Sequence, residues 1–448
     1  MPPELSDLTE ALLSAAKAAG AEAADAIAVE GRAVSIDVRG GALEQAERSE
    51  GVEIGLRVLI GGRQACVAAS DLSARTMADM AERAVAMARE APEDPHAGLA
   101  DPAQLASGWD IAAYELADPS PEPEAAALQA DACAAEAAAL AVSGVAQVQS
   151  ASASWSCRNL FMAATNGFAG GYARTSRSVS AVAISGEGAT MERDWAAESR
   201  VFQADLPSAI EVGTRAGERA VARAHPRPPK TGAFPVLLDE RVAGSVIGHL
   251  LSAINGTSIA RGASWLRDAL GEEVLPAGMN LIEDPFRPRI SGSRPFDAEG
   301  LPTRRRAIVE NGVLTGWTLD LATARKLGME STASASRGTT APPSPTTGNV
   351  TLTQGTQSRD ALLTEMGTGL IVTSFIGATI NPTTGDYSRG ANGFWVENGE
   401  IAWPVNECTI AGNLREMLRR ITPANDARAH LSHVVPSLRI EGLTLAGA

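Results

Sequence analysis

The sequence predicts an α+β protein, with a small N-terminal α/β domain whose helices lie on one face of a sheet and a β-rich C-terminal domain. The first observation is a pattern of one helix, four short strands and a second helix in the first 90 residues. The second is a pair of Val-Glu-Asn-Gly tetrapeptides in the C-terminal part, at 309–312 and 396–399. Asn-Gly is typical of tight hairpin turns, because both residues accept a positive φ.

Hydrophobic spacing predicts the elements of the first domain. Apolar residues at helical spacing predict helices over 4–20 and 72–89. Between them, glycines at 31, 40–41, 51 and 61–62 are natural turn positions. They divide the segment into four expected strands, at 24–29, 34–38, 52–59 and 64–69.

Proline-rich stretches indicate the domain boundaries. We expect an N-terminal α/β domain over 1–90, a linker over 91–123, a middle α+β region over 124–229 and a C-terminal domain over 230–448. The middle region begins with an alanine-rich helix, and Asn166-Gly167 is expected to form a hairpin turn between two strands.

The C-terminal region combines strands, a helix and two unusual segments. A buried strand over 234–238 precedes a helix over 240–255, with Gly256 expected as its C-cap. The low-complexity segment 331–348 is expected to be a mobile loop. The glycine-rich segment 367–393 suggests irregular backbone that another group approaches closely.

The charge and composition exclude several classes of protein. The net charge of −15 and the pI of about 4.9 disfavour nucleic-acid binding, because an acidic surface repels phosphates. The N-terminus lacks the pattern of a secretory signal, and no segment reaches the roughly 18–20 apolar residues of a membrane span. Four scattered cysteines form no C-x-x-C pair. The expected location is therefore the cytoplasm, with no membrane and no nucleic-acid partner.

No common catalytic motif occurs. The sequence lacks G-x-S-x-G, the phosphate-binding loop and H-E-x-x-H. His430 and His433 lie three residues apart without a neighbouring carboxylate or cysteine, which is typical of an exposed loop. His249 lies on the apolar stripe of the predicted helix over 240–255, which is typical of a packed, hydrogen-bonded histidine.

Several longer segments carry a resemblance to a known family. DERVAGSVIGHLLSAINGTSIARGASWL (239–266), LPAGMNLIEDPFRPRISGSRPFDAEG (275–300) and GDYSRGANGFWVENGEIAWPVNECTIAGNLREML (385–418) resemble the TldD/PmbA family, and specifically its TldE/PmbA branch. EGVEIGLRVLIGG (50–62) is similar to the family's first domain. The resemblance implies a C-terminal metalloprotease-like domain of the TldD/PmbA type.

The resemblance also implies that this chain lacks the family's zinc site. In the catalytic TldD branch the matching helix carries H-E-x-x-x-H, whose histidines bind zinc and whose glutamate is the general base, and a C-terminal cysteine completes the site. Here Gly244 and Ser245 replace the first histidine and the glutamate, His249 is retained, and 420–436 contains no cysteine. Because catalytic zinc needs three protein ligands, we expect no catalytic residue and no metal in this chain, with zinc in the partner subunit.

Two functions remain open. The first is a non-catalytic TldE/PmbA-type subunit that, with a TldD-type catalytic subunit, forms a heterodimeric zinc metalloprotease acting on unfolded peptides. Such peptides bind as extended strands, so Asn255, Asn381, Asn392 and Gly393 are candidates for a peptide groove. The alternative is a stand-alone, homodimeric peptide-binding or regulatory protein without protease activity.

Overall fold

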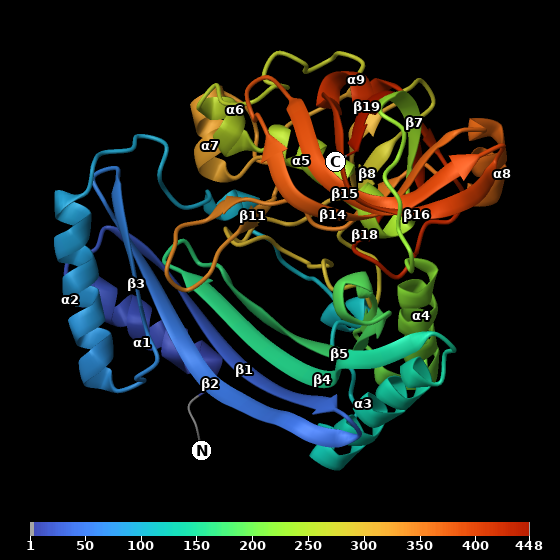
Figure 1. The fold of residues 1–448 in the computed structure, drawn as a ribbon. Helices are drawn as coiled ribbons and strands as arrows, with labels where there is room; N and C mark the ends of the chain where they lie inside the picture. Colours follow the sequence, from blue (N-terminus) through green and yellow to red (C-terminus); the bar gives the residue numbers. More distant parts are fainter. Residues whose placement is uncertain (1–3, 448) are drawn as a thin grey trace.

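A computed structural model describes residues 4–447, apart from the side chains of Ala378 and Thr379. A curved sheet built from the first half of the chain lies below a β-rich part built from the second half (Figure 1). Among the residues that the model describes, no helix is long and apolar enough to cross a membrane.

The curved sheet has six antiparallel strands in the order β3-β2-β1-β4-β5-β6. It unites strands from the predicted first and middle regions, because β1 pairs with β4 along most of its length. Its strands are β1 (Ala23–Arg39), β2 (Ala42–Ile60), β3 (Arg63–Ala69), β4 (Val145–Ala164), β5 (Ala169–Ser185) and β6 (Glu192–Arg200).

The prediction of four short strands in the first region was wrong. The two long strands β1 and β2 run straight through Gly31 and Gly51, which face each other in the register. A Cβ atom at either glycine would meet nothing within 4 Å, and neither has a positive φ. Turns occur only at the double glycines, where Gly40 and Gly41 have φ of 62° and 75°. An isolated glycine in a strand therefore did not mark a turn.

Four helices cover one face of the sheet, as predicted for the N-terminal domain. The first two, α1 (Leu5–Ala18) and α2 (Ala74–Glu90), share a hydrophobic core with the ends of β1, β2 and β3. The other two, α3 (Ala125–Leu140) and α4 (Ala209–Ala222), cover the same face further along β1, β4 and β5. Between α2 and α3 the chain forms the short 3-10 helices η1 (Pro102–Gln104) and η2 (Ile111–Tyr114), and η3 (Gly188–Thr190) and η4 (Gln203–Asp205) flank β6.

The C-terminal part contains a small barrel, in agreement with the predicted β-rich domain. The strand order is β16-β15-β14-β7-β19-β17, and β16 also pairs with β19, which closes the ring. The strands are β7 (Gly232–Leu238), β14 (Gly369–Ile380), β15 (Asp386–Glu397), β16 (Glu400–Asn413), β17 (Ile421–Pro423) and β19 (Leu438–Gly447). The predicted irregular segment 367–393 is thus largely regular strand.

A second, five-stranded sheet lies beside the barrel in the order β10-β9-β8-β13-β18. It consists of β8 (Leu281–Glu283), β9 (Arg306–Glu310), β10 (Val313–Leu314), β13 (Val350–Leu352) and β18 (His433–Val434). The Asn-Gly turns of the two Val-Glu-Asn-Gly tetrapeptides are confirmed, since Asn311, Gly312, Asn398 and Gly399 all have positive φ.

Helix α5 (Glu240–Ala253) buries its apolar side in the core shared by the barrel and the five-stranded sheet. The expected C-cap at Gly256 was wrong, because Gly256 begins a new helix whose N-cap is Asn255. The remaining helices are α6 (Gly256–Ala260), α7 (Leu321–Leu327), α8 (Arg359–Met366) and α9 (Leu414–Arg419).

The segment 331–348, expected to be mobile, is anchored in the structure. It forms a two-stranded ribbon of β11 (Ala335–Ser336) and β12 (Ser344–Pro345). Arg337, whose side chain is fully buried, forms an ion pair with Asp25 of β1. Asp25 is also paired with Arg57 of β2, whose Nε lies 2.6 Å from Oδ2. Low complexity therefore did not predict mobility here, because Arg337 ties the segment to the sheet and Asn255 and Arg294 donate hydrogen bonds to its carbonyl groups.

Candidate functional site

Helix α5 places the three residues of the degenerate motif in different surroundings. A Cβ atom at Gly244 would meet nothing within 4 Å, so this position borders open space. The Ser245 hydroxyl donates a hydrogen bond of 2.7 Å to the carbonyl of Val242 in the preceding turn. Positions 244 and 249 are five residues apart, about 140° around a regular helix, so they do not share a face.

His249 is packed rather than presented to solvent, as its apolar stripe suggested. Its ring lies edge-on to Tyr387 of β15, with 5.9 Å between the ring centroids. Burial, and then the nearby charge of Arg389, lower the pKa of His249 below its usual range. Among the described residues Nε2 has no hydrogen-bond partner, so the expected hydrogen bond is not present at this nitrogen. His249 is therefore a neutral aromatic side chain at neutral pH.

The residues present do not fit a catalytic zinc site. Such a site needs three protein ligands and an open position. Within residues 4–447 no group of three histidine, cysteine, aspartate or glutamate side chains is arranged to hold a metal ion. Cys408 is buried, its thiol donates to the carbonyl of Ala391, and burial raises its pKa to about 11. A protonated, buried thiol is a poor metal ligand.

A charge network lies next to the start of α5. Its centre is Glu198 of β6, whose side chain is 3% exposed and accepts hydrogen bonds from Arg200, Arg215 and Arg428. Arg428 also lies 3.7 Å from Glu240, in the first turn of α5. The network ties the edge of the curved sheet to α5. Sequence reasoning missed it because its partners are up to 230 residues apart.

The network shifts the pKa values of its own members. Burial acts to raise the pKa of Glu198, but the hydrogen bond from Arg200 and the charges of Arg428 and Arg200 outweigh it and lower that pKa. Burial and the neighbouring arginines lower the pKa of His430 to about 4. His430 Nε2 lies 3.5 Å from Glu198 and 3.1 Å from Nη2 of Arg428. The histidine is therefore neutral in an arginine-rich cluster.

Two of the four peptide-groove candidates stabilise local turns. The Asn255 side chain accepts a hydrogen bond from the amide of Thr257 and donates one of 2.8 Å to the carbonyl of Pro345. The Asn381 side chain accepts from the amides of Thr383 and Thr384 and is exposed. The structure does not bring these two asparagines together with the other two candidates.

Asn392 and Gly393 are neighbours in β15, where they shape the barrel. A Cβ atom at Gly393 would lie 1.7 Å from the carbonyl oxygen of Ile371, so the strand pairing requires glycine there. The Asn392 side chain accepts from the amide of Glu407 and donates to Ser374. Asn392 also lines a cavity of about 790 Å³ between the barrel and strands β5 and β6.

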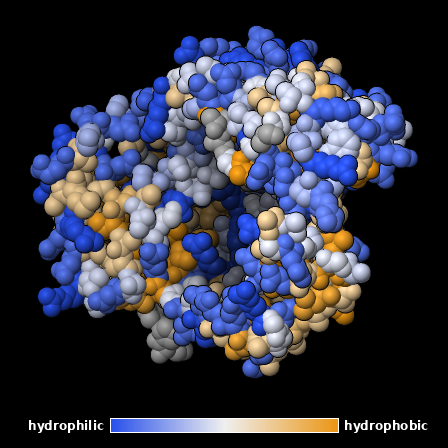
Figure 2. Space-filling model, in the orientation of Figure 1, coloured by the Kyte–Doolittle hydropathy of each residue, from blue (hydrophilic) through white to orange (hydrophobic). Residues whose placement is uncertain are grey.

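Small side chains fill the middle of the sheet face that looks toward the C-terminal part. Cross-strand partners share a face, and the alternate residues of β4 and β5 are buried beneath α3 and α4. Figure 2 shows the surface hollowed between the two parts of the molecule. The small residues are partly or fully exposed and comprise Gly31, Ala33, Ser35, Ser49, Gly51, Ser152, Ser154, Ser156, Ser176, Ser178, Ser180, Ala197 and Ser199.

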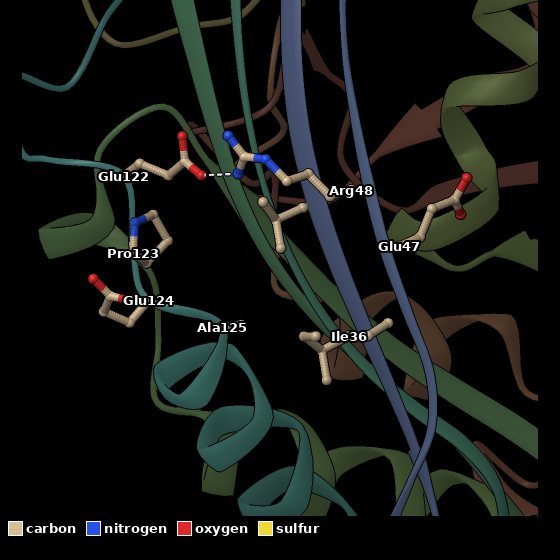
Figure 3. A pocket seen from close by; sticks show the side chains of 9 residues that line it. Ile36, Glu47, Arg48, Glu122, Pro123, Glu124 and Ala125 are labelled. Carbon is tan, nitrogen blue, oxygen red and sulfur yellow. Dashed lines mark hydrogen bonds and ion pairs between the residues drawn. The ribbon is translucent and has the colours of Figure 1, made fainter.

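A further cavity of about 410 Å³ lies on the opposite, helix-covered face. It lies between β1, β2 and the start of α3, where an ion pair joins Arg48 and Glu122 (Figure 3). Glu47 and Glu124 also line it. Arg48 is the basic residue in the lining of this cavity, and because it is already paired, the lining offers no free positive charge. The Arg48–Glu122 pair anchors the segment before α3 to β2.

Three family models match consecutive parts of the chain. Residues 24–88 match PmbA/TldA metallopeptidase domain 1, 115–224 match the central domain and 231–447 match the C-terminal domain. The metalloprotease PmbA of Escherichia coli O157:H7 is 35% identical over 415 residues, which cover 92% of this chain and 90% of that protein. A Haemophilus influenzae homologue of PmbA is 34% identical over 420 residues, 92% of this chain and 90% of that protein.

Solved structures share the whole fold. A proposed modulator of DNA gyrase from Bacteroides thetaiotaomicron superposes with a TM-score of 0.90 at 25% identity, covering 99% of this chain and 98% of that one. TldE from Thermococcus kodakarensis superposes with a TM-score of 0.85 at 20% identity, and the match covers 98% of this chain and 99% of that one. The fold and the sequence similarity to PmbA together show that this chain belongs to the PmbA/TldD family of metallopeptidases.

Proposed function

We propose that this chain is a non-catalytic, TldE/PmbA-type subunit that works with a TldD-type catalytic subunit on unfolded peptides. The observation that carries the proposal is helix α5, where Gly244 and Ser245 occupy the positions of the zinc ligand and the general base. Gly244 borders open space, so packing does not prevent a larger side chain there. The chain thus keeps the fold of a metallopeptidase without the donors that zinc catalysis needs, and the zinc belongs to the partner.

The hollow beneath the C-terminal part supports a role in holding peptide. Its floor offers serine hydroxyl groups and glycine backbone over three neighbouring strands, as in the cross-strand row Ser35, Ser154 and Ser178. Hydroxyl groups donate and accept hydrogen bonds, and small side chains let another backbone approach. An extended peptide recognised through its main chain suits such a floor and is bound with little sequence preference.

Co-purification with a homologue that has an intact H-E-x-x-x-H motif tests the proposal. We expect a stable complex, peptidase activity of the complex, and no activity of this chain alone. Replacement of the homologue's first motif histidine by alanine is the control and should abolish the activity. The homologue in isolation is assayed in parallel.

Two results would contradict the proposal. Peptidase activity of this chain alone, sensitive to chelator, would show that it is itself catalytic. Failure to form a complex, together with peptide binding by a homodimer, would favour the stand-alone alternative. Metal analysis after dialysis adds an independent readout, in which near one zinc per chain at neutral pH would also overturn the proposal.

A further inference from the structure

Four arginines line one cavity of about 340 Å³ at the seam between the curved sheet and the C-terminal part. Arg158 and Arg174 come from β4 and β5, where they face each other in the register. Arg294 and Arg337 come from loops of the C-terminal part. A concentration of positive charge is unexpected in a chain with a net charge of −15.

Three of these guanidinium groups are not neutralised. Within the part of the chain that the structure describes, Arg158, Arg174 and Arg294 form no ion pair with a carboxylate. Arg158 is exposed, and its guanidinium group has no hydrogen-bond partner there. Arg174 donates to the carbonyl of Ser293 at 2.6 Å, and Arg294 donates to the carbonyl of Ala335 at 2.9 Å. Carbonyl partners orient a guanidinium group without cancelling its charge.

The fourth arginine has an unpartnered donor. Arg337 is fully buried and pairs with Asp25 through Nη1. Both terminal nitrogens, Nη1 and Nη2, are buried and have no hydrogen-bond acceptor among the described residues. A buried donor without a hydrogen-bond partner is costly.

The acidic residue of the cavity does not offset this charge. Asp297 lines the cavity, but its carboxylate accepts hydrogen bonds from the amides of Glu299, Leu301 and Ala335. Burial raises the pKa of Asp297, and even its charged form balances only one of the three arginines that lack an ion pair. The cavity therefore keeps a net positive character.

One wall of the cavity is apolar and rigid. It is formed by Ile27, Leu160, Met162, Tyr172 and Phe296, and Met162 and Phe296 belong to a buried cluster. Phe296 is held by rings on several sides, with centroid distances of 4.9 Å to Trp109 and 5.0 Å to Phe168. The ligand that fits is an anion attached to an apolar body.

We propose that this cavity binds the last residue of a peptide, with its α-carboxylate on Arg158, Arg174 and Arg294 and an apolar side chain against Leu160 and Met162. The inference rests on the proposed function and names the substrate feature that this subunit recognises. Guanidinium groups match the planar geometry of a carboxylate. A single carboxylate on an otherwise neutral chain also avoids the repulsion that a polyanion meets from the acidic surface.

Fluorescence anisotropy with the full chain tests the proposal without any partner subunit. The probe is a labelled, uncharged tetrapeptide ending in leucine, compared as free acid and as C-terminal amide. We expect the acid to bind at least tenfold more tightly. Arg158→Gln and Arg174→Gln should each weaken binding of the acid about tenfold and leave the amide unchanged. The matched control is Arg83→Gln, an exposed residue of α2 on the opposite face of the sheet. It should change the binding of neither the free acid nor the amide.

Several outcomes would overturn the proposal. Equal binding of acid and amide, or unchanged binding by both cavity variants, would remove the carboxylate site. Inorganic phosphate displacing the probe as well as N-acetyl-leucine does would indicate a general anion site. An amidated peptide with an internal aspartate binding as tightly as the free acid would remove the preference for a chain end. The binding assay contains no catalytic partner, so none of these results bears on whether the proposed heterodimer forms. If the heterodimer does not form in the co-purification experiment, the binding assay still tests the carboxylate site.

Discussion

Both carboxylate oxygens of Glu198 accept hydrogen bonds from Nη2 of Arg428, at 2.6 and 2.7 Å. Glu198 belongs to the edge strand of the curved sheet, and Arg428 follows β17 in the C-terminal part. Arg200 and Arg215 hold the same carboxylate. One buried negative charge thus compensates a cluster of arginines beside α5, where the catalytic branch of the family is expected to hold zinc.

We predict that Glu198→Gln destabilises the protein by roughly 3 kcal/mol, because buried or half-buried guanidinium groups lose their common partner. Urea unfolding followed by circular dichroism measures the change. The control is Arg75→Gln, which removes an exposed pair with Asp79 and should cost no more than about 0.5 kcal/mol. Equal stability of the two variants would mean that the network does not stabilise the fold.

We predict that the protein loses stability in mild acid because of His430. Its pKa is about 4 in the folded protein and about 6.5 when unfolded, so between these values only the unfolded chain binds the proton. The stability that the folded protein gains from an uncharged His430 is therefore complete above about pH 6.5 and is lost as the pH falls toward 4. Because the side chain is 29% exposed, we expect on the order of 1 kcal/mol. Urea unfolding at pH 7 and pH 5 should show a smaller difference for His430→Asn than for the unchanged protein.

Local features of the fold were predictable where a residue type or spacing is typical of one kind of local structure. The Asn-Gly turns and the apolar stripe of α5 were correct because positive φ and helical spacing leave a direct mark on the sequence. Gly31 and Gly51 misled the strand assignment, since a glycine in a strand and a glycine in a turn look alike. The joining of β1 to β4 was not foreseen, because it pairs residues that are far apart in the chain.

The candidate site was less predictable than the fold. The proposed loss of zinc ligands at Gly244 and Ser245 rests on residue types at fixed positions of the family motif, so it needs only the sequence and stays a prediction. The Glu198 network and the arginine cavity depend on long-range packing, so no local pattern marks them. The place of Asn255 in a peptide groove stays a prediction; in the structure it is the N-cap of α6, a position where asparagine is common.

A pair of glycine substitutions tests the opposite roles of two strand glycines. We predict that Gly393→Val prevents stable folding, because a Cβ atom there would lie 1.7 Å from the carbonyl oxygen of Ile371. Gly51→Ala should be neutral or stabilise the protein by up to about 1 kcal/mol, since the position is open and φ is not positive. Soluble yield and thermal melting report both. A folded Gly393→Val protein would contradict the described pairing of β14 and β15.

We predict that Arg337 protects the segment 331–348 from proteolysis. Arg337→Ala should release this segment from Asp25 and expose it to limited proteolysis. Cleavage sites identified by mass spectrometry should fall within 331–348. Arg83→Ala, on the exposed side of α2, serves as the control and should leave the proteolytic pattern unchanged. Unchanged resistance of the Arg337 variant would show that other contacts hold the segment.

The last prediction concerns His249, the retained residue of the degenerate motif. We predict that His249→Ala lowers stability by about 1–3 kcal/mol and leaves peptide cleavage by the assembled pair almost intact. The reason is that the ring packs against Tyr387 and its Nε2 has no hydrogen-bond partner among the described residues, so its contribution is contact rather than chemistry. His249→Phe keeps an aromatic ring at this position and should restore most of the stability. Thermal melting and a peptidase assay on the same preparations separate the two effects. A collapse of cleavage in both variants with unchanged melting would assign His249 a part in the reaction, and the proposal of a purely structural role would then be withdrawn.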